Sequence, residues 1–179
     1  YMVAADRRGS GLNLGFSCAL TPFRHYVLGE ESMDRAATKN ETIEISRLLE
    51  EAMAAGAFGF STTNAGQHVG YKGRPLACRL ASDEELRAYC NILRKVGRGS
   101  IEVALTNEVS KVSASERDLL ELLLTESTRP VTWLALLNRD DDPEAVQRTL
   151  NEVDDLIKRG ARPQSTVRPF IIQIDLRTP

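Results

Sequence analysis

The sequence predicts an α/β fold in which parallel strands alternate with helices. Short apolar runs typical of buried parallel strands are each followed by an amphipathic helical pattern, and a helix-start signal recurs between them. An open doubly wound sheet and a closed (β/α)8 TIM-type barrel share this pattern, so both stay open at this point. No GxGxxG motif follows an expected strand, so a dinucleotide-binding fold has no support.

A helix is expected to begin at Thr38-Lys39-Asn40-Glu41, which has the capping-box pattern. One helical face then carries the apolar residues Ile45, Leu48, Leu49, Ala52 and Met53. Gly56 suits the C-terminal end of this helix. Residues 57–61 follow as a short buried strand.

A second capping box, Ser82-Asp83-Glu84-Glu85, predicts a helix that ends at Gly97 or Gly99. The next strand is expected over residues 101–105. A third capping box begins at Ser113 and opens a leucine-rich helix.

The C-terminal part continues the alternation with a strand over residues 130–137. Asp142 followed by Pro143 predicts an N-cap and a first helical position. The helix face is expected to carry Val146, Leu150, Val153 and Ile157, and the helix to end at Gly160. One more strand is expected over residues 163–174.

Composition limits the classes of partner. The 179 residues include 23 basic and 25 acidic residues, so charge gives no reason to expect nucleic acid or an anionic membrane. No apolar run approaches the roughly 18–20 residues of a membrane span. The three cysteines (Cys18, Cys78 and Cys90) have no paired spacing and predict reduced thiols in a cytoplasmic protein.

The ends of the chain predict a piece of a longer protein. The sequence opens at Tyr1 in what looks like mid-domain sequence and stops just after an apolar stretch. A (β/α)8 barrel needs about 250 residues. We therefore expect residues 1–179 to be roughly the middle half of one barrel domain, with homo-oligomerisation as a possibility.

Ligands of parallel α/β folds meet the C-terminal ends of the strands, which selects candidate residues. These are Ser61, Thr62, Asn107, Glu108, Asn138 and Arg168. Glu108 is the candidate for catalysis, as a general base or a metal ligand, and the others are candidates for substrate binding. Each also has a structural interpretation: strand-end hydroxyls satisfy the backbone, Glu108 lies in a solvated loop, and Arg168 forms a buried salt bridge.

The long loop from residue 64 to 81 is a second candidate, because long loops in compact domains are often functional. It carries His68, Arg74 and Arg79, of which His68 and Arg79 are taken as substrate-binding residues. His25 is expected to have a structural role. The cysteines have no positioned histidine, so nucleophilic cysteine catalysis is not expected.

Several stretches together resemble the N-acyl-D-amino-acid deacylases, the D-aminoacylase branch of the amidohydrolase superfamily. They are NLGF at residues 13–16, TPFRHYVLG at 21–29, LEEAMAAGAFGFST at 49–62 and GRPLACRLA at 73–81. In that family a helix ending EAxxAGAxG runs into a strand ending FST. The resemblance extends from about Asn13 to Arg168.

The resemblance implies a (β/α)8 barrel with a small flanking β domain, and zinc-dependent hydrolysis of an amide C–N bond in N-acylated amino acids. A metal in such enzymes polarises the carbonyl and activates water, and a carboxylate moves the proton. The family's HxH motif and its last-strand acid would fall outside residues 1–179. Arg168, Arg74 or Arg79 would then bind the substrate carboxylate as a bidentate fork, with Thr62 and Asn107 orienting it.

The chain departs from the family at two metal positions. The family places histidines after the two strands that follow the FST unit, where this chain has Asn107 and Asn138. Asparagine is a poor zinc ligand compared with imidazole, so no metal ligand is assigned. Two alternatives follow: a metal-free barrel that acts as a binding or scaffold module, and an enzyme with an altered metal site that uses Glu108. An intact HxH motif upstream would favour an enzyme.

Overall fold

The computed structural model describes residues 2–105, 108–138 and 140–165, which form one five-stranded parallel sheet with helices. The strands are β1 (Cys18–Ala19), β2 (Gly59–Thr63), β3 (Ser100–Ala104), β4 (Val131–Leu136) and β5 (Ala161–Ser165). All neighbouring strands are parallel, and their order in the sheet is their order in the chain. A doubly wound sheet reverses its strand order at a switch point. The observed order has no reversal and is that of a partial (β/α)8 barrel.

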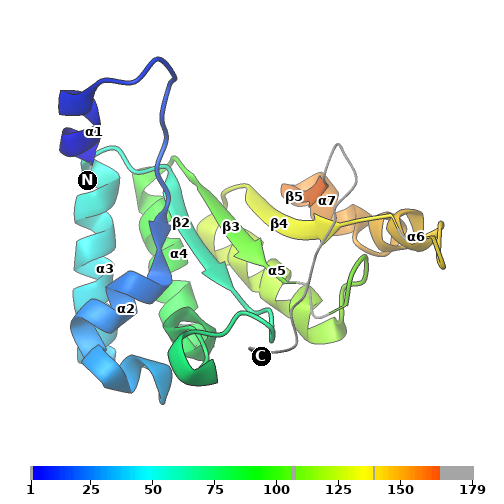
Figure 1. Cartoon of the computed structure of the whole chain (residues 1–179), viewed down its shortest axis with the longest axis horizontal. Helices are drawn as coiled ribbons and strands as arrows, with labels where there is room; N and C mark the ends of the chain where they lie inside the picture. Colours follow the sequence, from blue (N-terminus) through cyan, green and yellow to red (C-terminus); the bar gives the residue numbers. More distant parts are fainter. Residues whose placement is uncertain (1, 106–107, 139, 166–179) are drawn as a thin grey trace.

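The helices are α1 (Met2–Arg8), α2 (Leu20–Leu28), α3 (Lys39–Ala54), α4 (Asp83–Val96), α5 (Ala114–Ser127), α6 (Ala145–Glu152) and α7 (Asp154–Arg159). Three short 3-10 helices add η1 (Gly29–Met33), η2 (Tyr71–Gly73) and η3 (Ala77–Leu80). Figure 1 shows α3, α4 and α5 side by side behind β2, β3 and β4. Among the described residues no helix lies on the opposite face of these strands, which we refer to as the open face. No helix among the described residues has the length and hydropathy needed to cross a membrane.

All three predicted capping boxes are confirmed. In α3, α4 and α5 the N-cap hydroxyl accepts from the N3 amide while the N3 glutamate accepts from the N-cap amide. Gly97 ends α4 in the left-handed conformation, with φ 73°. Strand β2 begins two residues later than predicted, because the Ala57 amide still donates to the Ala52 carbonyl oxygen at 3.0 Å.

The predicted helix after Asp142 is wrong in two respects. Asp142 does not cap it: its carboxylate pairs with the Arg148 guanidinium, and Glu144 occupies the N-cap position without a side-chain cap. The single helix is also two helices, because Val153 adopts φ −113° and ψ 16° between α6 and α7. The strand predicted for residues 163–174 begins at Ala161, and residues 166–174 lie outside the described part.

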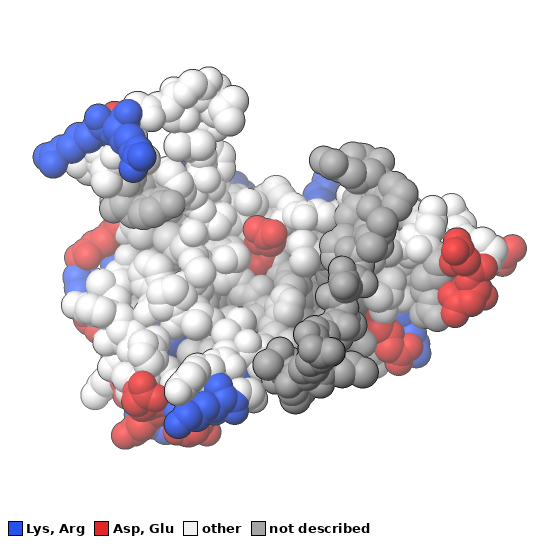
Figure 2. Space-filling view, in the orientation of Figure 1, with Lys and Arg blue, Asp and Glu red and all other residues white. Residues whose placement is uncertain are grey.

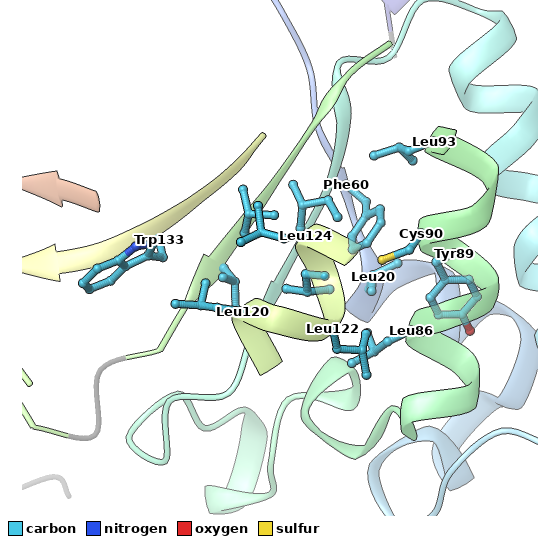
Figure 3. Packing of buried hydrophobic residues seen from close by; sticks show 14 of the residues in the cluster. Leu20, Phe60, Leu86, Tyr89, Cys90, Leu93, Leu120, Leu122, Leu124 and Trp133 are labelled. Carbon is cyan, nitrogen blue, oxygen red and sulfur yellow. The ribbon is translucent and has the colours of Figure 1, made fainter. Parts of the chain in front are cut away.

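The core lies between the sheet and its helices because strand residues alternate in direction. Phe60, Ile101, Val103 and Trp133 face the helices and are buried. Figure 3 shows Phe60 beside Cys90 and Leu93 of α4. The rings of Phe60 and Tyr89 meet edge to face at 6.5 Å. The strand residues that alternate with these buried ones therefore face the open side, where a ligand has access.

The α3 capping box gives a pH-dependent prediction. Arg35 binds both oxygens of Glu41, at 2.8 and 2.9 Å, and the Thr38 amide donates to the same carboxylate at 2.7 Å. Arg35 first, and then this amide, lower the pKa of Glu41 to about 2. The stabilisation is present above the ordinary glutamate pKa and is lost as pH falls through about 2.

We expect Glu41→Gln to lose less stability than the unaltered protein between pH 5 and pH 2, by on the order of 1 kcal/mol after solvent screening. Urea unfolding across this range measures it. Glu84→Gln, which changes an exposed carboxylate outside the ion pairs of the described residues, is the matched control. Equal pH profiles for Glu41→Gln and the unaltered protein would contradict the prediction.

Candidate functional site

A pocket of about 370 Å³ opens on the open face near the C-terminal ends of the first strands. We call it the sheet pocket. Its polar lining includes Ser61, Thr63, His68 and Glu102, and its apolar lining includes Leu20, Leu76 and Leu134. Figure 2 shows few charged side chains over β2 and β3 on this side of the molecule. Three of the predicted substrate-binding residues line this pocket: Ser61, Thr62 and His68.

Thr63 fixes the ring of His68. The Thr63 Oγ1 lies 2.8 Å from His68 Nδ1, 3.1 Å from the Ala65 amide nitrogen and 3.3 Å from the Ala104 carbonyl oxygen. A hydroxyl has one proton and two lone pairs. All three contacts are satisfied only if Thr63 donates to Ala104 and accepts from both Ala65 and His68. This hydrogen-bond assignment puts the imidazole proton on Nδ1, and within the described residues Nε2 has no partner.

The two arginines of the loop hold the loop itself. Arg79 donates to the carbonyl oxygens of Gly66, at 3.1 Å, and His68, at 3.3 Å. Arg74 pairs with Asp34 and Glu30, and its hydrogen bond to Asp34 is the main cause that raises its pKa. Both arginines of the loop are therefore held in hydrogen bonds or ion pairs, and the loop is ordered around His68.

Glu102 was missed by the sequence analysis. It is an exposed residue in the middle of β3, paired in register with Ser61 of β2, and it lines the sheet pocket. The signal was present in the sequence: the carboxylate interrupts an otherwise apolar strand between Ile101 and Val103. Because successive residues of a strand face opposite sides, this glutamate has to face away from the buried side.

A second pocket of about 300 Å³ lies behind the strand ends, at the first turns of α4 and α5. Arg79, Asp83 and Asp118 line it. Thr62 lines both this pocket and the sheet pocket.

The remaining candidates lie elsewhere. Glu108 is exposed, pairs with Lys111 Nζ at 2.8 Å, and lines a different pocket, of about 580 Å³, with Arg148. Asn138 is exposed beyond the end of β4. Asn107 and Arg168 lie outside the described residues. The structure thus brings Ser61, Thr62 and His68 together but does not bring Glu108 to them.

His25 and the cysteines occupy structural surroundings. His25 Nδ1 lies 3.2 Å from the Ser32 hydroxyl oxygen, between α2 and η1. The three cysteines are free thiols. Burial raises the pKa of Cys90 to about 12 and also raises that of Cys18. Both pKa shifts oppose the formation of a thiolate nucleophile at these residues.

The described residues do not fit a metal centre of their own. Within residues 2–105, 108–138 and 140–165, no three His, Cys, Asp or Glu side chains are placed to hold a metal ion. The two histidines of the chain lie in separate surroundings, one beside Ser32 and one beside Thr63. What the site offers is hydroxyls, one oriented imidazole and one carboxylate around an apolar-walled pocket.

No protein-family model matches the chain, and no curated protein matches it significantly. Solved structures of D-aminoacylase do match. One, described for the role of its binuclear metal centre, is 21% identical with a TM-score of 0.57. A second, a mutant in complex with CuCl2, is 20% identical with a TM-score of 0.56. A third, described as defining a novel subset of amidohydrolases, is 20% identical with a TM-score of 0.57.

Each similarity covers 80% of this chain and 28% of the D-aminoacylase chain. The resemblance seen in the sequence is therefore confirmed at the level of the fold. The matched part is a partial barrel that spans little more than a quarter of those proteins.

Proposed function

We propose that the protein containing this chain is a metal-dependent amidohydrolase that cleaves the amide C–N bond of an N-acylated amino acid. The observation that carries the proposal is the structural similarity to D-aminoacylases over 80% of the chain. The sequence stretches at residues 21–29 and 49–62, which resemble the same family, also support it.

In this proposal the described residues supply substrate binding. Ser61 presents its hydroxyl from the middle of β2, Thr62 lines the pocket next to it, and His68 presents an oriented ring at the same pocket. Such groups bind and orient an amide by hydrogen bonds. Binding of the substrate carboxylate by Arg168, and catalysis by Glu108, stay predictions.

The described residues do not supply a complete metal site, because no three of their His, Cys, Asp or Glu side chains are placed to hold a metal ion, so further ligands from outside them are needed. Zinc is our expectation for the metal, and D-aminoacylase with a binuclear metal centre is among the similar structures. We derive no reaction step through the metal from this chain.

The test uses the purified full-length protein, without added chelator. We expect about one or more zinc ions per chain by elemental analysis, hydrolysis of a panel of N-acetylated D- and L-amino acids, loss of activity on chelation and recovery on adding zinc. Ser61→Ala is expected to lower kcat/KM by about tenfold, the scale of one lost hydrogen bond to a substrate. Thr132→Val, on the same sheet face but outside the sheet pocket, is the control.

A folded protein with no bound metal and no hydrolysis would contradict the proposal. It would support the metal-free binding or scaffold module, which the structural neighbours do not favour.

A further inference from the structure

We propose that the sheet pocket binds an ammonium group carried on a short alkyl chain, with Glu102 as its counter-charge. This inference rests on the proposed function for its substrate class: acylated amino acids whose side chain ends in a primary amine. It is argued from three properties of the sheet pocket: its charge, its apolar lining and whether its polar groups donate or accept hydrogen bonds.

The charge of the sheet pocket comes from Glu102. The carboxylate lies in a row of register partners that runs from Ser61 through Glu102 and Thr132 to Arg162. Arg162 is two strands away, roughly 10 Å, and donates to the carbonyl oxygens of Ile157 and Ala161, at 2.8 and 3.0 Å. Among the residues that the structure describes, no cation forms an ion pair with Glu102.

The cations of the loop from residue 64 to 81 do not line the sheet pocket, and Lys72 has its ammonium group 5.3 Å from the centroid of the Tyr71 ring. Arg79 is held by backbone carbonyl groups, and Arg74 by Asp34 and Glu30. A substrate carboxylate in this pocket would therefore meet Glu102 and be repelled. A cation would be attracted, and the attraction is strengthened when surrounding chain and ligand exclude water.

The walls suit an alkyl stem. Leu20, Leu76 and Leu134 line the pocket, so methylene groups would pack on apolar surface there. Glu102 comes two residues before the end of β3 at Ala104, which places its backbone roughly 7 Å below the strand end. A ligand that enters from the strand ends would lay its stem on the leucines and bring its head group to the carboxylate.

The hydrogen-bonding sense agrees with the charge. The Thr63 contacts put a His68 proton on Nδ1, and in the neutral ring Nε2 is then an acceptor at the same pocket. Glu102, when ionised, is also only an acceptor. A pocket with two such acceptors favours a ligand that supplies donors, and an ammonium group supplies three.

The first experiment measures binding without catalysis. Calorimetry on the full-length protein compares n-pentylammonium with n-pentanol, which has a similar chain and no charge. We expect Glu102→Gln to weaken pentylammonium binding at least fivefold and to leave pentanol binding unchanged. Glu50→Gln, on the exposed side of α3, is the control and should change neither. Equal binding of pentylammonium by Glu102→Gln and the unaltered protein would overturn the inference.

The second experiment measures selection. The ratio of kcat/KM for Nα-acetyl-lysine to that for N-acetyl-norleucine is expected to fall at least tenfold in Glu102→Gln. An unchanged ratio would overturn the inference while leaving the proposed function standing. If neither substrate nor any other acylated amino acid is hydrolysed, the proposed function fails. The calorimetry then still tests whether the sheet pocket binds an alkylammonium ion through Glu102.

A third measurement needs no variant, in case Glu102→Gln does not fold. A carbodiimide activates accessible carboxylates, which then couple to any amine present, including pentylamine itself, so mass spectrometry follows the rate at which unmodified Glu102 is lost. Pentylammonium is expected to slow this rate and pentanol to leave it unchanged, while Glu50 reacts at the same rate in both. No protection of Glu102 would contradict the inference.

Discussion

Replacing Gly59 by alanine is expected to destabilise the protein by at least about 3 kcal/mol, because it combines a backbone clash with a strained conformation. A Cβ atom on this residue would lie 1.8 Å from the carbonyl oxygen of Ser100, and the residue has φ +135°. Gly59 and Ser100 are also the first paired residues of β2 and β3. The clash is with backbone, so relief requires the two strands to separate where their ladder begins.

Thermal or urea unfolding of Gly59→Ala measures the effect. Gly29→Ala is the matched control, because Gly29 also has positive φ, at +63°, but its Cβ position has no atom within 4 Å. Gly29→Ala is expected to lower the free energy of unfolding by about 1 kcal/mol, which is the cost of positive φ for alanine without the steric clash. A Gly59→Ala variant as stable as Gly29→Ala would show that the strands accommodate the methyl group.

Removing one partner of the buried ion pair between Arg24 and Glu85 is expected to cost about 3–5 kcal/mol, because the other charge is left buried and uncompensated. The two side chains are 0% and 1% exposed. The pair joins α2 to the first turn of α4. Arg24 also donates to the carbonyl oxygens of Ala77 and Arg35, each at 2.8 Å.

Glu85 completes the same network. It accepts from the Ala37 amide at 2.8 Å, the Ser82 amide at 3.1 Å and the Tyr89 hydroxyl at 3.0 Å. Burial first, and then the Glu85 carboxylate, raise the pKa of Tyr89, so the phenol keeps its proton and donates it. Every polar atom of the pair is thus engaged, which is the condition under which a buried pair is retained.

A double-mutant cycle with Arg24→Met and Glu85→Gln checks this prediction by urea unfolding. The double variant is expected to lose less stability than the sum of the two single variants, because it leaves no unpaired charge. Tyr89→Phe, which removes one hydrogen bond and keeps the ring, is the control and should cost about 1 kcal/mol. Additive losses in the cycle would mean that the two charges act independently.

Local signals predicted the helices well, and long-range contacts account for what the sequence did not predict. The capping boxes at Thr38, Ser82 and Ser113 are confirmed because each is complete within four residues. Asp142 failed as a cap because Arg148, six residues away, binds its carboxylate. No local pattern distinguishes these two uses of an aspartate.

The architecture also required the structure. Strand order separates a barrel from a doubly wound sheet, and order is a property of which strands pair, not of any one strand. The site shows the same division. Strand ends selected Ser61 and Thr62, whereas the Thr63–His68 contact depends on how the loop folds back. Glu102 can be assigned to the open face from strand alternation, because it interrupts the apolar residues Ile101 and Val103.

Two of the arginines that fix the segment beside the sheet pocket, Arg24 and Arg79, donate to main-chain oxygens. Arg24 holds Ala77 in this way, and Arg79 holds Gly66 and His68. A carbonyl oxygen is present whatever side chain its residue carries, so these anchors do not depend on the identity of the anchored residue. The side chains of the anchored residues can therefore be exchanged while these hydrogen bonds are kept. The segment from residue 64 to 81 is accordingly a natural target for directed evolution of ligand preference on an unchanged scaffold.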